Sequence, residues 1–117
     1  MNSSSDLCDV RFSSVLLDSI DEVLSNLLGE HVKQTIYGCL ERRGLRKYQI
    51  PENLRGFDAF LEDNFGRGGA VIERQIAKRL YTQLGLQLFE VPHYALTDYV
   101  SMASHQQSRG RAILSKI

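Results

Sequence analysis

The stretch from Phe57 to Gly85 constrains the fold of this chain most, because it joins two apolar runs of helical spacing through a cluster of glycines. The apolar residues recur every three or four positions and so share one face of a helix. They are Leu54, Phe57, Phe60, Leu61 and Phe65 before the cluster, and Val71, Ile72, Ile76, Leu80 and Leu84 after it. Three glycines within residues 66–69 can end one helix and begin another almost at once. The stretch therefore predicts a helical hairpin, and its three Phe residues predict the centre of the core.

Two further amphipathic helices are predicted before the hairpin, over about residues 13–28 and 30–43. Their apolar faces are Leu16, Ile20, Val23, Leu24, Leu27 and Leu28 in the first, and Val32, Ile36, Cys39 and Leu40 in the second. A glycine follows each helix, and glycine suits the left-handed conformation that ends many helices. Pro51 is expected in the first turn of the next helix, where its missing N–H is not needed. The serine-rich residues 1–12 are expected to form a flexible leader.

The pattern changes after Gly85. Residues 86–91 alternate imperfectly between apolar and polar side chains, which predicts a short strand or an extended arm that Pro92 limits. A lone strand is not stable without a partner, so the segment either pairs with a second copy of the chain or packs as coil. The candidate interface residues are therefore Leu86, Leu88, Phe89 and Val91.

These elements predict an all-α fold. Four main helices form a compact, bundle-like core domain at residues 13–85, and residues 86–117 form a C-terminal extension. The extension consists of the short arm and a short helix over residues 94–103, followed by a polar segment at 105–110 that we expect to be mobile. A small apolar end at 112–117 can dock or stay loose. Because apolar faces are numerous and the arm has no evident partner, we expect a homodimer.

Composition indicates one domain of an ordinary soluble protein. The chain has 117 residues, of which 43% are apolar and 24% charged, and its net charge of zero implies no general attraction to nucleic acid or anionic membranes. No stretch approaches the roughly 20 apolar residues of a membrane helix, and no secretory signal is recognisable. Cys8 and Cys39 make neither a disulfide framework nor a zinc site. We therefore expect a cytoplasmic protein with no cofactor and no membrane partner.

The residue types that catalyse reactions do not combine into a reactive centre in this sequence. None of the three histidines has a metal-ligating residue four positions away. Glu62 and Asp63 are adjacent, so a helix points them in different directions. The glycine cluster follows a helix and lacks the lysine and hydroxyl of a phosphate-binding loop. No nucleophile, base and orienting group are evident together, and we predict that the chain is not an enzyme.

Charge is distributed unevenly along the chain. Residues 6–30 contain six acids and one arginine, and the C-terminal end is basic through Arg109, Arg111 and Lys116. Between them lies a basic cluster formed by Arg42, Arg43, Arg46 and Lys47, with Tyr48 beside it. Such a cluster can contact nucleic-acid phosphates. Next to an acidic helix, however, it more often forms a solvated corner or a set of intramolecular ion pairs.

The chain resembles the Nitrosopumilus output domain, a small archaeal helical domain, between about residues 15 and 85. The matching positions are Gly29-x-x-Val32-x-x-x-Ile36-Tyr37-x-x-Leu40-Glu41, Ile50-Pro51-Glu52, Phe60-Leu61, Phe65-Gly66-x-Gly68, Val71-Ile72-Glu73 and Leu80-Tyr81. Gly69 and the short connector at Leu45 depart from the pattern. The resemblance implies a cytoplasmic archaeal protein with a regulatory output role, because such domains occur alone or behind sensory modules in signalling proteins. It implies no catalytic residues.

The sequence leaves three functions open. The first is a non-enzymatic signalling or interaction domain that binds a protein partner, including another copy of itself. The alternative is a small DNA-binding regulator that uses residues 42–47 and the arginines of the C-terminal end. The third is a binder of a small apolar or anionic ligand between helices.

Overall fold

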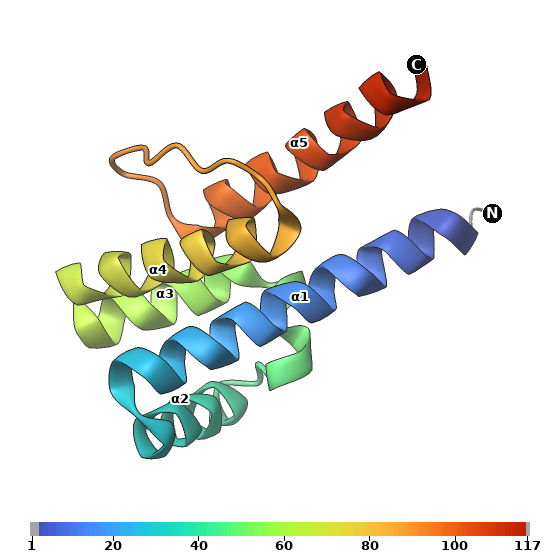
Figure 1. The fold of residues 1–117 in the computed structure, drawn as a ribbon. Coiled ribbons are helices and arrows are strands. Elements are labelled where there is room, and N and C mark those ends of the chain that lie inside the picture. Colours follow the sequence, from blue (N-terminus) through green and yellow to red (C-terminus); the bar gives the residue numbers. More distant parts are fainter. Residues whose placement is uncertain (1–2, 117) are drawn as a thin grey trace.

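Helices form most of the structure. The computed structural model describes the backbone of residues 3–116 and the side chains of residues 11–106. Within these limits it contains five α-helices, one 3₁₀-helix and no strand (Figure 1). Their bounds are α1 at Ser3–Leu28, α2 at Glu30–Arg42, η1 at Lys47–Glu52, α3 at Leu54–Phe65, α4 at Arg67–Leu84 and α5 at Leu96–Lys116. The predicted all-α fold is confirmed.

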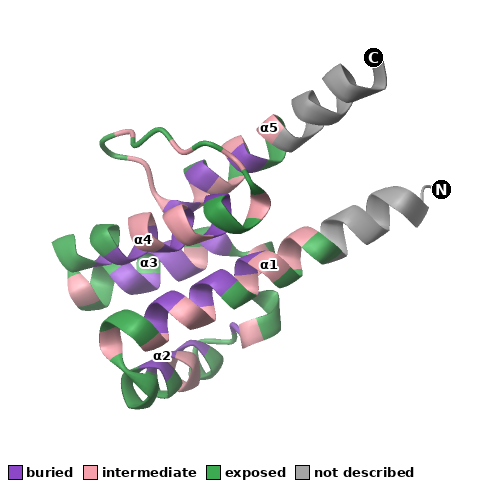
Figure 2. Ribbon diagram, viewed as in Figure 1, coloured by how far each residue is buried: buried purple, intermediate pink, exposed green. Residues whose placement is uncertain are grey.

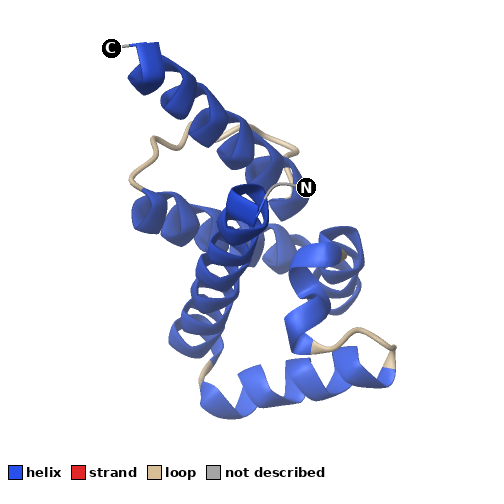
Figure 3. Ribbon diagram, turned by 90° about the vertical axis from the view of Figure 1, so that its right-hand side faces the viewer, coloured by secondary structure: helices blue, strands red, loops and turns tan. Residues whose placement is uncertain are grey.

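The helices are arranged around α1 and α4, which pack side by side and run in opposite directions (Figure 1). α3 packs against α4 as the other half of the hairpin, and α5 packs against both. α2 packs against α1, and η1 lies against α1, α2 and α3. The connection between α4 and α5, at residues 85–95, is the longest non-helical segment of the described chain (Figure 3).

The core is centred on α4, which packs against α1 on one side and against α3 on another, and every other helix contributes to it (Figure 2). Seven of the predicted apolar positions there are at most 1% exposed: Leu16, Ile20, Leu24, Phe57, Leu61, Ile76 and Leu80. Three others predicted on apolar faces are exposed instead, namely Leu27 at 49%, Val32 at 37% and Val71 at 47%. The face that each helix turns to its neighbours is narrower than its apolar stripe, so the edge of the stripe meets solvent.

The hairpin between α3 and α4 turns on a single residue. Gly66 has a φ of 56°, a left-handed value that glycine adopts without strain, and α4 begins at the next residue. Gly69, in the first turn of α4, lies against the backbone of α3. A Cβ built on Gly69 would be 2.7 Å from the carbonyl oxygen of Leu61. The absence of a side chain at residue 69 therefore lets the two helices touch at the turn.

α3 begins later than the position of Pro51 predicted. Pro51 lies inside η1 and not in the first turn of α3, so that prediction was wrong. The cap of α3 is Asn53, whose side-chain oxygen accepts a hydrogen bond from the N–H of Gly56 at 3.1 Å. A capping asparagine satisfies one of the N–H groups that a helix start leaves without a partner, and this fixes the beginning of α3 at Leu54.

Both ends of the chain are more helical than predicted. α1 begins at Ser3, so residues 3–12 continue the helix in place of the predicted flexible leader. No glycine or proline interrupts residues 3–28, and nothing in the sequence stops the helix there. α5 is also longer than the predicted helix at 94–103 and includes the polar residues 105–110. The predicted docking of side chains at 112–117 lies outside the residues whose side chains are described.

The first part of α5, whose side chains are described, belongs to the packed core. Leu96, Tyr99 and Ala103 are each at most 2% exposed. The hydroxyl of Tyr81, on α4, donates a hydrogen bond to the carbonyl oxygen of Tyr99 at 2.7 Å. The boundary predicted at residue 85 therefore does not separate a packed part of the chain from an unpacked one.

Candidate functional site

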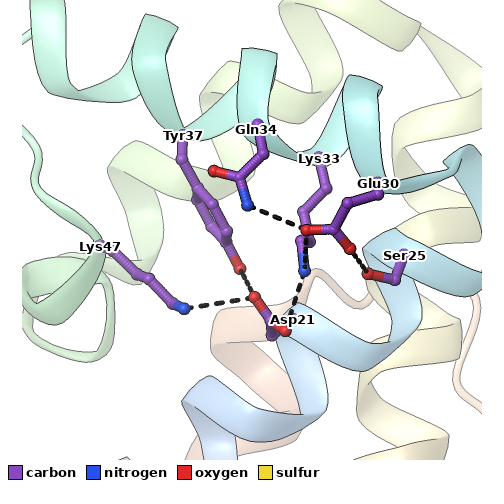
Figure 4. Close-up of polar contacts among 7 residues, drawn as sticks. All are labelled: Asp21, Ser25, Glu30, Lys33, Gln34, Tyr37 and Lys47. Atoms are coloured by element: carbon purple, nitrogen blue, oxygen red, sulfur yellow. Dashed lines mark hydrogen bonds and ion pairs between the residues drawn. The ribbon is translucent and has the colours of Figure 1, made fainter.

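A polar network centred on Asp21 joins α1 to α2 and η1 (Figure 4). The ammonium group of Lys33, on α2, lies 3.0 Å from Asp21 Oδ2, and that of Lys47, on η1, lies 3.2 Å from Asp21 Oδ1. The hydroxyl of Tyr37 donates a hydrogen bond to Asp21 Oδ1 at 3.2 Å. One carboxylate therefore holds three elements of the fold in register.

Glu30 extends this network at the start of α2. Its carboxylate lies 3.0 Å from the ammonium group of Lys33 and accepts a hydrogen bond from the Ser25 hydroxyl at 3.0 Å. The hydrogen bond with Glu30 and then that with Asp21 raise the pKa of Lys33. Partial burial acts to raise the pKa of Asp21, but hydrogen bonds from Lys33 and Lys47 outweigh it and lower that pKa below its usual value. Asp21 and Lys33 are thus both charged at neutral pH.

A hollow of about 600 Å³ opens between α1 and η1 beside this network. Its lining combines apolar and aromatic side chains, three acids, two serines and one lysine, which are Leu17, Tyr48 and Pro51, then Asp18, Asp21 and Glu52, then Ser13 and Ser14, and finally Lys47. The side chain of Tyr48 is 80% exposed. Because Lys47 is already paired with Asp21, the hollow presents an apolar surface with an acidic rim. We call it the α1–η1 hollow.

Lys47 was predicted as part of a nucleic-acid-binding cluster, and the structure uses it inside the chain. Besides its ion pair with Asp21, its ammonium group lies 5.1 Å from the centre of the Tyr37 ring. A cation over an aromatic face is attracted by the electrons of the ring. Lys47 therefore anchors η1 to α1 and α2.

The three arginines of that cluster are all exposed, and two have partners within the chain. The guanidinium of Arg43 lies 5.0 Å from the centre of the Phe60 ring. Arg42 donates a hydrogen bond to the Cys39 sulfur at 3.1 Å. The side chain of Arg46 is exposed at the start of η1. The four predicted residues therefore do not form one uniform group of solvated cations.

The predicted interface segment at residues 86–91 lies as coil, which is one of the two outcomes its pattern allowed. Glu90 pairs with Arg74 at 3.6 Å and with Lys78 at 3.5 Å, both on α4. Among the candidate interface residues, Leu86 and Leu88 pack against the core, Val91 is partly buried and Phe89 is 62% exposed. Phe89 is thus the residue of this segment that a partner can contact.

Two buried carboxyl groups hold the start of α5. Asp58, on α3, is 5% exposed, and Glu73, on α4, is 1% exposed. Asp58 Oδ2 accepts hydrogen bonds from the N–H of Thr97 at 3.1 Å and from its hydroxyl at 2.6 Å. Glu73 Oε1 accepts a hydrogen bond from the N–H of Leu96 at 3.1 Å. The first N–H groups of a helix have no partner within it, so these two side chains cap α5 from other helices.

Each carboxyl group has one further oxygen, Asp58 Oδ1 and Glu73 Oε2, that accepts no hydrogen bond from an N–H or hydroxyl group. Burial, and next the charge of Asp58, raises the pKa of Glu73 to about 8. Burial also raises the pKa of Asp58, although the hydrogen bonds from Thr97 oppose this. Glu73 is therefore the protonated member at neutral pH, and its proton pairs the two oxygens. The remaining negative charge faces the N-terminus of α5, where a helix dipole favours it.

This acid pair was not predicted from the sequence. The two acids considered there as a pair, Glu62 and Asp63, are both exposed. A signal was present, because Asp58 lies four residues after Leu54 and three before Leu61, within the apolar stripe of its helix. An acid at a position that must be buried needs a hydrogen-bonding partner, and this spacing could have identified it.

Among the residues with described side chains, no group of three or more His, Cys, Asp and Glu residues is placed to hold a metal ion. No helix of the described part is both long and apolar enough to cross a membrane. Cys39 is a free, partly buried thiol, and the side chain of Cys8 lies outside the described residues.

Comparisons of the chain with protein-family models, curated proteins and solved structures gave no match. The resemblance to the Nitrosopumilus output domain therefore stays a prediction based on the residues quoted above. The geometry of the α1–η1 hollow and of the acid pair is the basis for the proposals that follow.

Proposed function

We propose that this chain is a non-enzymatic protein-interaction domain that associates with a second copy of itself through the α1–η1 hollow. The observation that supports it is one hollow with Leu17, Pro51 and the 80% exposed Tyr48 inside an acidic rim. Exposed aromatic side chains with apolar neighbours are frequent anchors of protein interfaces. A regulatory role in cytoplasmic archaeal signalling is part of the same proposal and rests on the resemblance alone.

The C-terminal end of the chain has the chemistry that would complement this hollow. No acid follows Asp98 in the sequence. Within residues 109–117, three cations accompany three large apolar residues: Arg109, Arg111 and Lys116, with Ile113, Leu114 and Ile117. Docking of a helix with apolar and basic residues into an apolar groove is a common mode of peptide recognition. Opposite charge at the rim adds specificity and speeds association.

A second copy is the source of this segment that the fold favours. α5 packs against α3 and α4, whereas the hollow is formed by α1 and η1. α5 and η1 lie on opposite sides of the α1–α4 pair (Figure 1). Two copies that each place a basic C-terminal end in the hollow of the other would form a closed dimer with two-fold symmetry.

Sedimentation velocity over a range of protein concentrations tests the proposal. We expect a dimer that dissociates on dilution and weakens as salt rises, because salt screens exposed charges. Tyr48→Ser should weaken the dimer by at least about tenfold, and the double variant Asp18→Lys with Glu52→Lys should weaken it further. Asp63→Lys is the matched control, because this exposed acid lies on α3 outside the hollow and should leave the dimer unchanged.

A monomer mass at every concentration would contradict the proposal. A dimer that tolerates the Tyr48 and acid variants would instead involve another surface, and Phe89→Ser tests the predicted interface segment directly. Gel shift with generic duplex DNA tests the nucleic-acid alternative. Binding that falls steeply with salt and is lost on replacing Arg42 and Arg46 by Ala would favour that alternative.

A further inference from the structure

The acid pair lies where a single proton can control the docking of α5. We propose that the proton shared by Asp58 and Glu73 holds α5 against α3 and α4, and that α5 loosens from the rest of the chain as the pH rises from about 5 to about 8. The proposal is independent of self-association, because neither acid lines the α1–η1 hollow.

Geometry links the proton to the position of α5. The three hydrogen bonds that the pair accepts all come from the first turn of α5, through Leu96 and Thr97. Both carboxyl groups are nearly fully buried while that turn is docked. When the turn moves away, the carboxyl groups lose these donors and meet water, in which each ionises at its ordinary pH. Docking of α5 and protonation of the pair are therefore thermodynamically linked.

Without the proton, two like charges would face each other in a buried site. None of the ion pairs among the described residues involves Asp58 or Glu73, so no cation offsets that repulsion. Unpaired buried charge is costly, and moving α5 away relieves the cost by admitting water. The proton removes one charge and joins the two oxygens that otherwise lack a donor.

A third acid near the pair adds to the repulsion between the two carboxyl groups. Glu62, on α3, raises the pKa of both acids through its negative charge. A hollow of about 440 Å³ beside Glu73 is also lined by Arg67 and Arg74 of α4 and by His93 and Tyr94 of the connection to α5. On α5 itself, Asp98 accepts a hydrogen bond from the N–H of Ala95 at 2.9 Å. Because Glu73 is one of the residues that line this hollow, water in the hollow can exchange the carboxyl proton of Glu73 without unfolding of the chain.

Other contacts of α5 make the response graded. Leu96, Tyr99 and Ala103 are buried while α5 is docked, and this apolar burial favours docking independently of the charge of the pair. The pKa of Glu73 is about 8 when α5 is docked, whereas an exposed glutamate has a pKa of about 4.3. The equilibrium constant for opening of α5 should therefore rise about tenfold per pH unit between about pH 5 and pH 8, and level off above that range.

Amide hydrogen exchange measured by NMR, corrected for the pH dependence of intrinsic exchange, tests this directly. In the wild type, the protection of α5 amides should fall about a thousandfold from about pH 5 to pH 8 and should stay below that of the core amides of α1, which exchange through global unfolding. In Glu73→Gln, protection of α5 should vary less than about threefold over this range. The glutamine amide can donate to Asp58 and its oxygen can accept from Leu96, but it does not titrate.

Glu62→Gln is the matched control. It removes a neighbouring exposed acid, so the steep pH dependence should remain. The ¹³C shift of the Glu73 carboxyl carbon in the wild type gives a second test that needs no variant, and it should titrate near pH 8.

Three outcomes would overturn the proposal. They are equal slopes in the wild type and Glu73→Gln, titration of Glu73 near its ordinary value, and equal protection of α1 and α5 at every pH, which would mean that α5 opens only by global unfolding.

Discussion

Gly69→Ala adds one methyl group where the backbones of α3 and α4 meet. At an unstrained helical position, replacing glycine by alanine stabilises by up to about 1 kcal/mol, because glycine loses more conformational freedom on folding. Gly69 lies in α4 and is not among the glycines with positive φ, so this gain applies to it. The new Cβ, however, would lie 2.7 Å from the Leu61 carbonyl oxygen and 3.0 Å from the Glu62 nitrogen.

Those atoms belong to the backbone of α3, which has no rotamer to change. Relief of the clash requires the two helices to separate by several tenths of an ångström next to Phe57, Leu61 and Ile76, all fully buried. Overpacking of a filled core costs about 1–3 kcal/mol. After a gain of about 1 kcal/mol from helix propensity is subtracted, Gly69→Ala should lower the free energy of unfolding by up to about 2 kcal/mol.

The neighbouring residue offers a matched control. A Cβ on Gly68 would have its nearest contact at 3.6 Å, with the Cβ of Phe65, which is an ordinary van der Waals distance. Gly68→Ala should therefore be neutral or stabilise by up to about 1 kcal/mol. Urea unfolding followed by far-UV circular dichroism compares the two variants, with an unchanged denaturant slope as the condition for the comparison. The reasoning fails if Gly69→Ala is as stable as Gly68→Ala.

Three further predictions concern the start of α3, the seating of α5 and the response to pH. Asn53→Ala removes the cap that satisfies the Gly56 N–H and should cost about 1 kcal/mol in urea unfolding. Tyr81→Phe leaves the buried carbonyl oxygen of Tyr99 without its donor and should cost about 1–2 kcal/mol in the same assay, with the loss of protection concentrated in α5. Because Glu73 is protonated in the folded state and ionised in the unfolded state between about pH 5 and pH 8, the free energy of unfolding should fall by about 1.4 kcal/mol per pH unit there. Urea unfolding at a series of pH values measures this, and a flat profile would contradict the assignment of the proton.

Helix positions in the middle of the chain followed from local chemistry. The predicted helix at 30–43 corresponds to α2 at Glu30–Arg42, and the predicted end at Gly85 follows α4 directly. Gly29 and Gly85 have φ values of 89° and 69°, so the backbone at both points has a conformation that glycine alone takes easily. The spacing of apolar residues and the position of such glycines were sufficient for these elements.

The ends of the chain and the start of α3 were harder to predict. The second half of α5 has no continuous apolar stripe, and periodicity therefore gave no sign that the helix continues. At α3, Pro51 was the predicted start signal, whereas the side-chain hydrogen bond of Asn53 places the start of the helix after residue 53. Where a sequence allows two different local structures, it does not by itself show which of them forms.

The polar sites could not be predicted from spacing, because their members come from different helices. Asp21 and Lys47 are 26 residues apart, and Asp58 and Thr97 are 39 residues apart. No periodic pattern links such positions. The basic cluster at 42–47 could be recognised in the sequence. Ion pairs with the acids of the first helix were, however, only one of the roles that the sequence left open for it. An acid within an apolar stripe was the single local sign of the second site.

The two polar sites hold aspartates in opposite surroundings, and this predicts opposite responses to pH in the two halves of the fold. Lys33 and Lys47 lower the pKa of Asp21. Its ion pairs therefore stabilise the fold fully at pH values above the ordinary aspartate pKa, and this stability is lost as pH falls through the lowered pKa. The Asp58–Glu73 pair has no cation and depends on a proton, so it weakens as pH rises. Acid should therefore loosen α2 and η1 first, whereas a rise from about pH 5 to pH 8 should loosen α5 first. Amide exchange resolved by helix would show this polarity, and the reasoning is wrong if α2 and α5 lose protection together at both extremes.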